Sequence, residues 1–462
     1  MFETSVYTSR RKKLRQLMQN GLVLIMGNQD SPMSYPGNAY RFRQDSSFLY
    51  FFGLNLPGLA GVIDLDEGKD MLFGDDVTLE DIIWMGHLPS LKENGSKVGV
   101  NIAFPYAELE KVLSEAKSKG RPIHFLPPYR AERTIELERL LGIPHAEVKN
   151  HVSEQLIKAV VKLRLVKDEF EIAEVENYLS TATYEMHMAV MHMAKPGVIE
   201  RTIAGYIEGI SLSYGGTVCY PVILTSHGET MHIHSHDNVL KKGDLLLIDA
   251  GAETPMGYAT DITRTIPVGG KYSQKQKDIY NVVLAGQLGA IAAIKAGVKY
   301  MDVHFTASRI IAQGLKDLGL MKGDIDQAVQ QGAHALFFSH GIGHSLGLDV
   351  HDMEDLGEDY VGYDEETHRS NIFGTAYLRI GKKLEAGNIV TVEPGVYFIP
   401  ALIDRWEAEK KFTEFINYDK VDEYRDFGGI RTEDNVLATP DGHRILGKPI
   451  PKTVEEVEET MK

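Results

Sequence analysis

The segment HGIGHSLGLDVHD at positions 340–352 is the feature that most constrains this chain. Imidazoles and carboxylates at this density are costly in a folded protein unless each one has a partner or reaches solvent. The segment therefore has to fold against something it can bind, and by itself it predicts a metal site or an acid–base site. Its titratable residues are His340, His344, Asp349, His351 and Asp352.

Two aspartates are candidates to meet these histidines. Residues 243–267 predict two strands with a short glycine-containing connection, and Asp249 ends the first, apolar strand. Asp261 lies on the predicted returning strand, so a hairpin can bring both carboxylates to one site. A simple turn aspartate beside Gly251 is the alternative interpretation of Asp249.

Two glutamates also emerge from apolar strands. Glu393 precedes Pro394 in NIVTVEPG, and Glu433 lies within the predicted strand GGIRTEDNVLA. One such glutamate could face solvent on an edge strand, but four acids of this kind together with a histidine cluster argue against that interpretation. Oxygen-rich ligands with one imidazole suit Mn²⁺ or a similar divalent ion better than zinc. Four carboxylates exceed what one ion needs, so two of them could bridge a pair of metals.

The composition excludes several classes of protein. A formal net charge of −16 argues against a nucleic-acid-binding protein. Cys219 is the single cysteine, so no internal disulfide can form and a reducing compartment fits. The polar N-terminus lacks the apolar core of a signal peptide. The longest apolar runs, 21–27 and 245–248, are the length of strands and too short to span a membrane. We therefore expect a cytoplasmic protein that binds neither membranes nor nucleic acid.

The chain changes character near residue 150. Before it, predicted strands alternate with helices, which is typical of an α/β domain. After it come a long helical region at 151–195 and then β-rich segments between further helices, and every acid and histidine with a predicted role lies in this part. We expect domains at 1–150 and 151–462. The strands predicted in the first domain are 21–27, 48–54, 61–66, 69–75 and 122–128.

Five segments, in this order, resemble the metal-site motifs of the pita-bread metallopeptidases: IDAGAE, TDITRT, HGIGHSLGLDVHD, TVEPGVYF and GGIRTEDN. The resemblance is closer to the Xaa-Pro peptidases, prolidase and aminopeptidase P. YRFRQDSSFLYFFGL, PGLAGVIDLD and WMG resemble the N-terminal domain of these enzymes, so nearly the whole chain is covered. The resemblance implies an α+β fold in which a pita-bread (creatinase-like) catalytic domain follows a smaller α/β domain.

The resemblance also implies a dinuclear centre of two divalent ions, Mn²⁺ foremost, with Co²⁺ and Zn²⁺ as alternatives. In this family Asp261 and Glu433 would bridge the two ions, and Glu393 would also carry a proton to the departing proline nitrogen. The positions that match the family's metal ligands are Asp249, Asp261, His344, Glu393 and Glu433.

Three further histidines match catalytic positions of the family. His340 and His351 would bind the substrate carbonyl and stabilise the tetrahedral intermediate. The third comes from MHIHSHDNV, where the spacing to the first ligand aspartate selects His232 but leaves His234 and His236 open.

Three other residues have expected roles that rest on the resemblance. Tyr220 matches a tyrosine of prolidases at the substrate site, although core packing explains it equally well. Arg431 is expected to anchor Glu433 by a charge-assisted hydrogen bond. Arg379 resembles the arginine with which prolidases bind the free carboxylate of a dipeptide, and an exposed surface cation is its alternative.

The favoured function is therefore that of an Xaa-Pro dipeptidase, which hydrolyses the bond between an N-terminal residue and proline. The alternative is an aminopeptidase P that acts on longer peptides. A non-catalytic pita-bread binding protein and a metal-independent creatinase-like hydrolase are weaker alternatives, because all five ligand positions are filled. The expected partners are small peptides with proline in second position, and the resemblance suggests a homo-oligomer.

Overall fold

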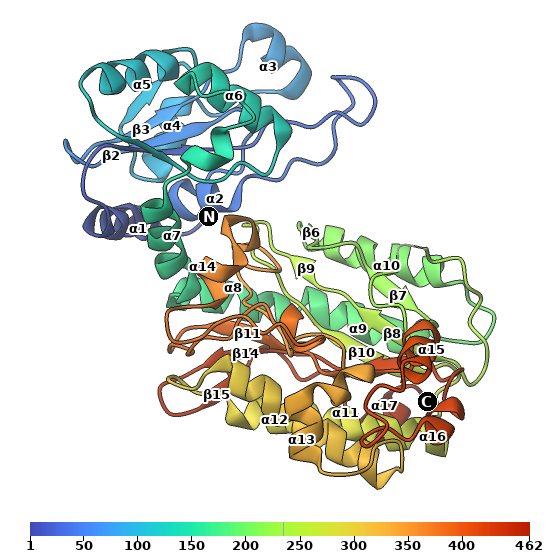
Figure 1. Cartoon of the computed structure of the whole chain (residues 1–462). Coiled ribbons are helices and arrows are strands. Elements are labelled where there is room, and N and C mark those ends of the chain that lie inside the picture. Colours follow the sequence, from blue (N-terminus) through green and yellow to red (C-terminus); the bar gives the residue numbers. More distant parts are fainter. Residues whose placement is uncertain (234) are drawn as a thin grey trace. The chain divides into compact units, whose positions relative to one another are not determined.

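The computed structural model describes residues 1–233 and 235–462. The chain forms two compact units (Figure 1). The first contains Met1–Arg164 and Met353–Tyr360, and the second contains Leu165–Asp352 and Val361–Lys462. The chain thus first passes from one unit to the other at Arg164, later than the change of character near residue 150 that the sequence suggests. Over the described residues, no helix combines the length and the apolarity that a membrane span requires.

The first unit is built on one five-stranded mixed sheet in the order β4-β3-β2-β1-β5. The pairs β1–β5 and β3–β4 are parallel, and the other two pairs are antiparallel. The interior strand β1, between β2 and β5, is a continuous apolar run, which is what a strand covered on both faces requires. The strands are β1 (Leu22–Met26), β2 (Ala60–Asp64), β3 (Asp70–Phe73), β4 (Ile102–Phe104) and β5 (Ile123–Phe125).

Helices cover this sheet. On one face Leu24 and Val62 pack into the same core as Leu113 and Leu137 of the two amphipathic helices α5 and α6. The helices of the first unit are α1 (Thr4–Leu17), α2 (Ser46–Phe52), α3 (Leu79–Met85), α4 (Leu91–Lys97), α5 (Glu108–Ser118), α6 (Ala131–Leu141), the 3₁₀ turns Val148–His151 and Glu354–Leu356, and all but the last residue of α7 (Glu154–Leu165).

The strand predicted at 48–54 is wrong, because these residues lie in helix α2 and its C-cap. The Asp45 side chain caps the first turn, and Gly53 ends the helix with a left-handed φ of 62°. All residues of α2 are buried, so the segment lacks the amphipathic period that marks a helix in a sequence. A Cβ at Gly61 would lie 2.2 Å from the Phe52 ring, so α2 packs directly against β2.

The second unit contains several small antiparallel sheets. Three-stranded sheets form in the orders β10-β8-β7 and β11-β14-β15, and β12–β13 and β6–β9 form pairs. The strands are β6 (Thr217–Val218), β7 (Ile223–Thr225), β8 (Leu245–Asp249), β9 (Ala252–Glu253), β10 (Thr263–Pro267), β11 (Ile389–Val392), β12 (Gly395–Tyr397), β13 (Gly429–Arg431), β14 (Asp434–Ala438) and β15 (His443–Ile445).

Within this unit, α8, α9 and α10 lie on one side of the strands, and α11 and α12 lie on the other (Figure 1). The helical region predicted at 151–195 is divided into α7, α8 and α9, and a capping box at Asp168 starts α8. The remaining helices are α8 (Glu169–Ser180), α9 (Ala182–Met193), α10 (Glu200–Ser213), α11 (Gln274–Ala293), α12 (Tyr300–Asp317), α13 (Ile325–Gln331), α14 (Glu358–Gly362, at the passage between the units), α15 (Pro400–Ala408), α16 (Tyr418–Asp422) and α17 (Val454–Thr460), with 3₁₀ turns at Ala333–Leu336 and Thr375–Tyr377.

Two buried histidines make the second unit sensitive to acid. The rings of His304 and His334 lie 6.3 Å apart, and their nitrogens have no hydrogen-bond partner among the described residues. Burial lowers the pKa of His334 to about 4 and that of His304 well below its usual value. The unfolded chain takes up these protons below pH ~6.5, whereas folded His334 does so only near pH 4 and the pKa of folded His304 is also lowered, so stability is full above pH ~6.5 and falls as the pH drops below it.

We expect the free energy of unfolding to fall by about 2 kcal/mol between pH 6.5 and pH 5 on account of His334, and His304 acts in the same direction. Urea unfolding at several pH values measures this change. A His334→Leu variant should show a smaller fall than the wild type, and an equal fall in both proteins would contradict the assignment.

Candidate metal centre

A hairpin of β8 and β10 brings the first two predicted acids together. The antiparallel register pairs Asp249, the last residue of β8, with Thr263, the first residue of β10. Asp261 lies just before β10 rather than on it. The Asn435 side chain holds its backbone, accepting from the Asp261 N–H at 3.1 Å and donating to its carbonyl at 2.5 Å. The two carboxylates therefore emerge at the same end of the hairpin.

His344 comes from the irregular segment 340–352. Its backbone N–H donates to Thr391 Oγ1 at 3.1 Å, and its carbonyl accepts from the Thr391 N–H at 2.9 Å. Its ring Nδ1 lies 3.1 Å from the Ser345 carbonyl, so Nδ1 carries a proton and Nε2 faces the acids. Gly343 makes this close approach feasible, because a Cβ there would lie 2.3 Å from the Thr391 carbonyl oxygen.

The two predicted glutamates lie at the ends of neighbouring strands. Glu393 follows β11, and its N–H donates to the Ile342 carbonyl at 2.8 Å. Glu433 lies between β13 and β14 and not within a strand as predicted. Its Oε2 accepts from Thr263 Oγ1 at 2.7 Å. The antiparallel pairing of β11 with β14 places the two glutamates beside each other and opposite the β8–β10 hairpin.

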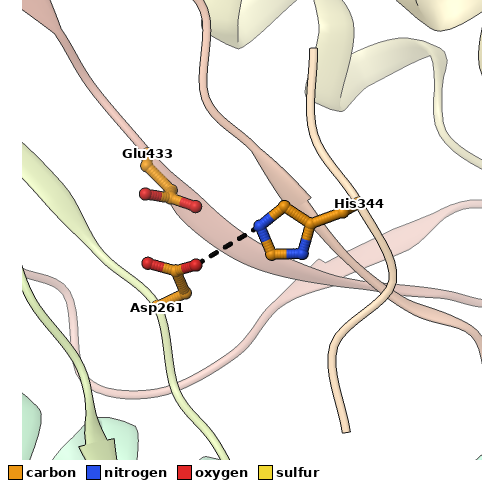
Figure 2. A group of neighbouring side chains, drawn as sticks. All are labelled: Asp261, His344 and Glu433. Carbon is orange, nitrogen blue, oxygen red and sulfur yellow. Dashed lines mark ion pairs between the residues drawn. The ribbon is translucent and has the colours of Figure 1, made fainter. Parts of the chain in front are cut away.

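Three of these side chains form a compact group (Figure 2). Asp261, His344 and Glu433 each place one potential ligand atom within 4.8 Å of the other two. His344 Nε2 lies 3.3 Å from Asp261 Oδ2 and 3.6 Å from Glu393 Oε1. Glu433 is 1% exposed, and its Oε1 is buried without a hydrogen-bond partner among the described residues. A buried carboxylate oxygen with an open lone pair is a position for a cation.

The pKa values of the group record the crowding of like charges. Burial, reinforced by the charges of Asp261 and Glu393, raises the pKa of Glu433 well above its usual range. Burial also raises the pKa of Glu393 to about 7. For Asp261, burial and the Asp249 charge raise the pKa despite the hydrogen bond from His344. An oxygen-rich group with one imidazole that holds excess protons fits divalent metal ions.

Metal loading should therefore release protons. Because the pKa of Glu393 is about 7 and that of Glu433 is raised well above its usual range in the metal-free protein, a cation has to compete with protons for these carboxylates, and the apparent metal affinity falls as the pH is lowered from 7 to 5. We expect a loss of about tenfold per pH unit for each proton displaced. Calorimetric Mn²⁺ titrations in two buffers of different ionisation enthalpy measure that number, and a pH-independent affinity would contradict the prediction.

Tyr220 lies at the candidate metal centre and not in a hydrophobic core away from it. Its hydroxyl is 2.6 Å from Asp249 Oδ1 and also within hydrogen-bond distance of Asp261. A phenol has one proton, so it can donate to one carboxylate while the other shares its own proton with the phenol oxygen. Burial, followed by the charges of the two aspartates, raises the pKa of Tyr220 well above its usual value. The phenol stays neutral beside the acids.

The predicted partner of Arg431 is wrong. Arg431 was expected to anchor Glu433, but its Nη2 donates to Asp249 Oδ2 at 2.6 Å and its Nη1 donates to Tyr397 Oη at 3.0 Å. Arg431 is the last residue of β13 and Glu433 lies beyond the end of that strand, so the two side chains need not share a direction, and the arginine reaches across to the hairpin. Burial raises the pKa of Asp249, but the guanidinium more than offsets this and holds it below its usual range.

Two catalytic histidine candidates lie around the group. His340 Nε2 is 2.8 Å from Tyr397 Oη, and its Nδ1 is 2.8 Å from the Gly341 carbonyl. Burial, aided by Arg431, lowers the pKa of His340 to about 3, so its ring is neutral. His351 packs edge to face on the proposed ligand His344, with ring centroids 4.3 Å apart.

A cavity of about 950 Å³ in the second unit is lined by most of the residues described above, namely Tyr220, Asp249, Asp261, His340, His344, His351, Glu393 and Arg431. His232 is on its wall and exposed, His236 is not among its lining residues, and His234 lies outside the described residues. Arg379 is also on the wall and half-buried, so it is not a fully exposed surface cation. The apolar part of the wall comes mainly from Phe373, Tyr377, Ile399, Leu402, Val350 and Ile223.

Sequence reasoning missed Tyr397. This buried tyrosine of β12 places its hydroxyl between His340 and Arg431 and thereby links a candidate catalytic histidine to the arginine that holds Asp249. Within the apolar run GVYF its ring is indistinguishable from a core aromatic. The available signal was its position two residues after Gly395 in one of the five metal-site segments.

The comparisons with known proteins agree with this architecture. Residues 179–440 match the model of metallopeptidase family M24, and residues 7–124 match that of the aminopeptidase P N-terminal domain. Human Xaa-Pro dipeptidase is 32% identical over 98% of this chain and 91% of its own length. The Aspergillus fumigatus protein named probable Xaa-Pro aminopeptidase pepP is 33% identical over 90% and 87%. Escherichia coli aminopeptidase P with the inhibitor Pro-Leu superposes with a TM-score of 0.81 at 30% identity, covering 100% of this chain and 98% of that one.

The fold and the cluster of acids define a metallopeptidase. The chain belongs to metallopeptidase family M24 and carries the N-terminal domain of the aminopeptidase P type. The family predicted from the five segments is therefore confirmed. The predicted fold class, an α+β pita-bread catalytic domain preceded by a smaller α/β domain, is confirmed as well.

Proposed function

We propose that the protein is a metal-dependent exopeptidase that hydrolyses the bond between an N-terminal residue and proline, and that it acts foremost as an Xaa-Pro dipeptidase. The observation that carries the proposal is the convergence of five residues, predicted as ligands from widely separated segments, on one buried group. The names of the relatives, Xaa-Pro dipeptidase and aminopeptidase P, support the substrate class. The set that would hold two divalent ions is Asp249, Asp261, His344, Glu393 and Glu433.

When bound, the ions would polarise the scissile carbonyl and make water a competent nucleophile at neutral pH. Glu393 would carry the proton that moves to the proline nitrogen. The proline nitrogen, like any amide nitrogen, needs this proton because it leaves readily only as an amine. The products of dipeptide hydrolysis are therefore a free amino acid and proline with a protonated ring nitrogen.

His340 and His351 would donate hydrogen bonds to the carbonyl oxygen as negative charge develops on it. Neutral His340 has one ring N–H, which donates to the Gly341 carbonyl, and its Nε2 accepts from Tyr397 Oη, so donation to the substrate would require the ring to give up one of these contacts. His232, on the cavity wall, would add a third donor. Tyr220 and Arg431 would hold Asp249 in position for the metal.

Dipeptide specificity rests on Arg379. A half-buried guanidinium on the wall of this cavity can pair with the carboxylate of a C-terminal proline. An aminopeptidase P that cleaves longer peptides is the second candidate, favoured by the close superposition on the Escherichia coli enzyme. In that enzyme class the substrate continues beyond proline, so an arginine at this place would not meet a carboxylate.

Kinetics of Arg379→Ala separate the two activities. For a dipeptidase we expect kcat/KM for Ala-Pro to fall about 10- to 100-fold, the value of one charge-assisted pair, with a smaller change for Ala-Pro-Ala. Arg405→Ala is a matched control, because Arg405 also lines the cavity but its exposed side chain pairs with Glu409 at 3.1 Å. Equal losses on both peptides, or a wild-type preference for the tripeptide, would instead identify an aminopeptidase.

We also propose Mn²⁺ as the native metal, because the donor set is rich in carboxylates. Elemental analysis of protein purified from its natural source tests this, and Co²⁺ or Zn²⁺ in its place would refute it.

No hydrolysis of either peptide after Mn²⁺ addition would support a binding protein, and activity that survives chelation would support a creatinase-like hydrolase. The proposed homo-oligomer and cytoplasmic location are tested by light scattering and by cell fractionation.

A further inference from the structure

Lys167 and Asp352 form a fully buried ion pair in the second unit. Lys167 Nζ donates to Asp352 Oδ2 at 2.9 Å, and each side chain is 1% exposed. The two residues are 185 positions apart in the sequence. Neither belongs to the five predicted ligands, and Asp352 directly follows His351. A carboxylate and an ammonium at this depth are costly unless they are paired, so each depends on the other.

Asp352 is built into the loop that carries His344 and His351. Its N–H donates to the Ser345 carbonyl at 3.0 Å, and the same carbonyl lies 3.1 Å from His344 Nδ1. A Cβ at Gly347 would lie 2.5 Å from Asp352 Oδ2, so only glycine leaves room for the carboxylate inside the loop. One carbonyl thus joins the backbone of Asp352 to the ring of a proposed metal ligand.

The backbone at Lys167 is hydrogen-bonded to another segment, the turn that precedes β11. Its N–H donates to the Gly387 carbonyl at 2.9 Å, and Asn388 Nδ2 donates to the Leu165 carbonyl at 3.0 Å. Both acceptor and donor belong to the turn that precedes β11, the strand that ends at Glu393. Gly387 has a left-handed φ of 98°, which favours glycine at this turn. The lysine therefore connects the base of β11 with the loop of His344 and His351.

We propose that Lys167 is a positioning residue, which acts through Asp352 to hold His351 against His344 and to hold the His344 ring toward the acids. Its part in turnover rests on the proposed function. Without the ammonium, the Asp352 carboxylate would lose the cation that lies 2.9 Å from its Oδ2, which favours gain of a proton or movement toward water. Either change shifts the segment between Ser345 and Asp352, and the two histidines with it.

The test is a double-mutant cycle of Lys167→Met, Asp352→Asn and the double variant. For Lys167→Met we expect kcat on Ala-Pro with Mn²⁺ to fall about 10- to 100-fold, with KM nearly unchanged. Losses of this size are typical when a residue that orients a metal ligand, without binding the metal itself, is replaced. The double variant removes both charges of the pair and should recover much of the lost kcat. Arg11→Met is the control, because it breaks a buried ion pair of the first unit (Arg11 Nε to Asp70 Oδ2, 2.8 Å) and should lower stability without lowering kcat.

A second measurement needs neither metal nor turnover. Histidine side-chain NMR spectra of the metal-free proteins report the ring environments, and His351→Gln and His344→Gln assign the two signals. We expect both signals to shift in Lys167→Met and to return toward their wild-type positions in the double variant, while the signal of His334 stays in place.

Unchanged signals of His344 and His351, or a kcat of Lys167→Met equal to that of Arg11→Met, would reduce Lys167 to a purely structural role and overturn the proposal. If Lys167→Met does not fold, Asp352→Asn and the double variant give the same comparison. A wild-type protein that does not cleave Ala-Pro refutes the proposed function alone, since the spectra still decide the positioning role.

Discussion

Replacing His344 with alanine should lower Ala-Pro hydrolysis by about 10³-fold or more and sharply reduce metal occupancy. His344 is the one imidazole in a group of carboxylates, and its Nε2 points at Asp261 and Glu393. Its ring is also held by the Ser345 carbonyl, so no neighbouring histidine can take over its place. Kinetics with added Mn²⁺ and elemental analysis of the purified variant measure the two losses.

His334→Leu is the matched control for this change. His334 is equally buried, but its ring lies beside His304 and not among the acids. It should keep its metal and most of its activity. A His344→Ala variant that still cleaves Ala-Pro with its metal content intact would refute the assignment of the centre.

Replacing Arg431 with methionine should destabilise the metal-free protein by about 3–5 kcal/mol. The guanidinium is buried, bonds Asp249 and Tyr397, and is the positive charge that holds the pKa of Asp249 below its usual range. Without it, the carboxylates of the centre lose their permanent counter-charge. Urea unfolding of the metal-free protein at pH 7 measures the loss.

Metal should rescue this variant in part. Bound cations supply positive charge to the same carboxylates, so the difference between variant and wild type should be smaller in the presence of Mn²⁺ than in a chelator. Arg431→Lys keeps the charge but loses the second hydrogen bond, and we expect a smaller loss of stability. An equal loss for Met and Lys, with or without metal, would show that packing rather than charge explains the role of Arg431.

Much of the candidate centre could be predicted from the sequence because its residues are charged or titratable groups in places where burial is costly without a partner. Acids at the ends of apolar strands, as at Asp249 and Glu393, and histidines packed into thirteen residues are costly unless they meet a partner, so each is visible without a structure. Their order along the chain also identified the family. Whether each residue binds metal remains a prediction, but the fold brings all five into one place.

Residues whose type is ordinary for their place in the sequence could not be recognised in this way. The ring of Tyr397 fits an apolar strand, and the fully buried α2 has no polar face, so its aromatic run resembles a strand. Lys167 follows a helix in which a solvated lysine would be ordinary, and nothing near it in the sequence points to Asp352. The partner of Arg431 depends on the direction in which a side chain leaves the end of a strand.

The sequence by itself therefore determined the family and the fold class, through the resemblance of its five segments to a known family. It also determined the set of groups that need a partner, because composition and spacing are enough to identify a costly charge. Only the tertiary structure decided which groups become partners: Arg431 with Asp249, Tyr397 with His340, and Lys167 with Asp352. These pairs join segments that are far apart in the chain. Their geometry follows from strand register and loop closure, which no local pattern encodes.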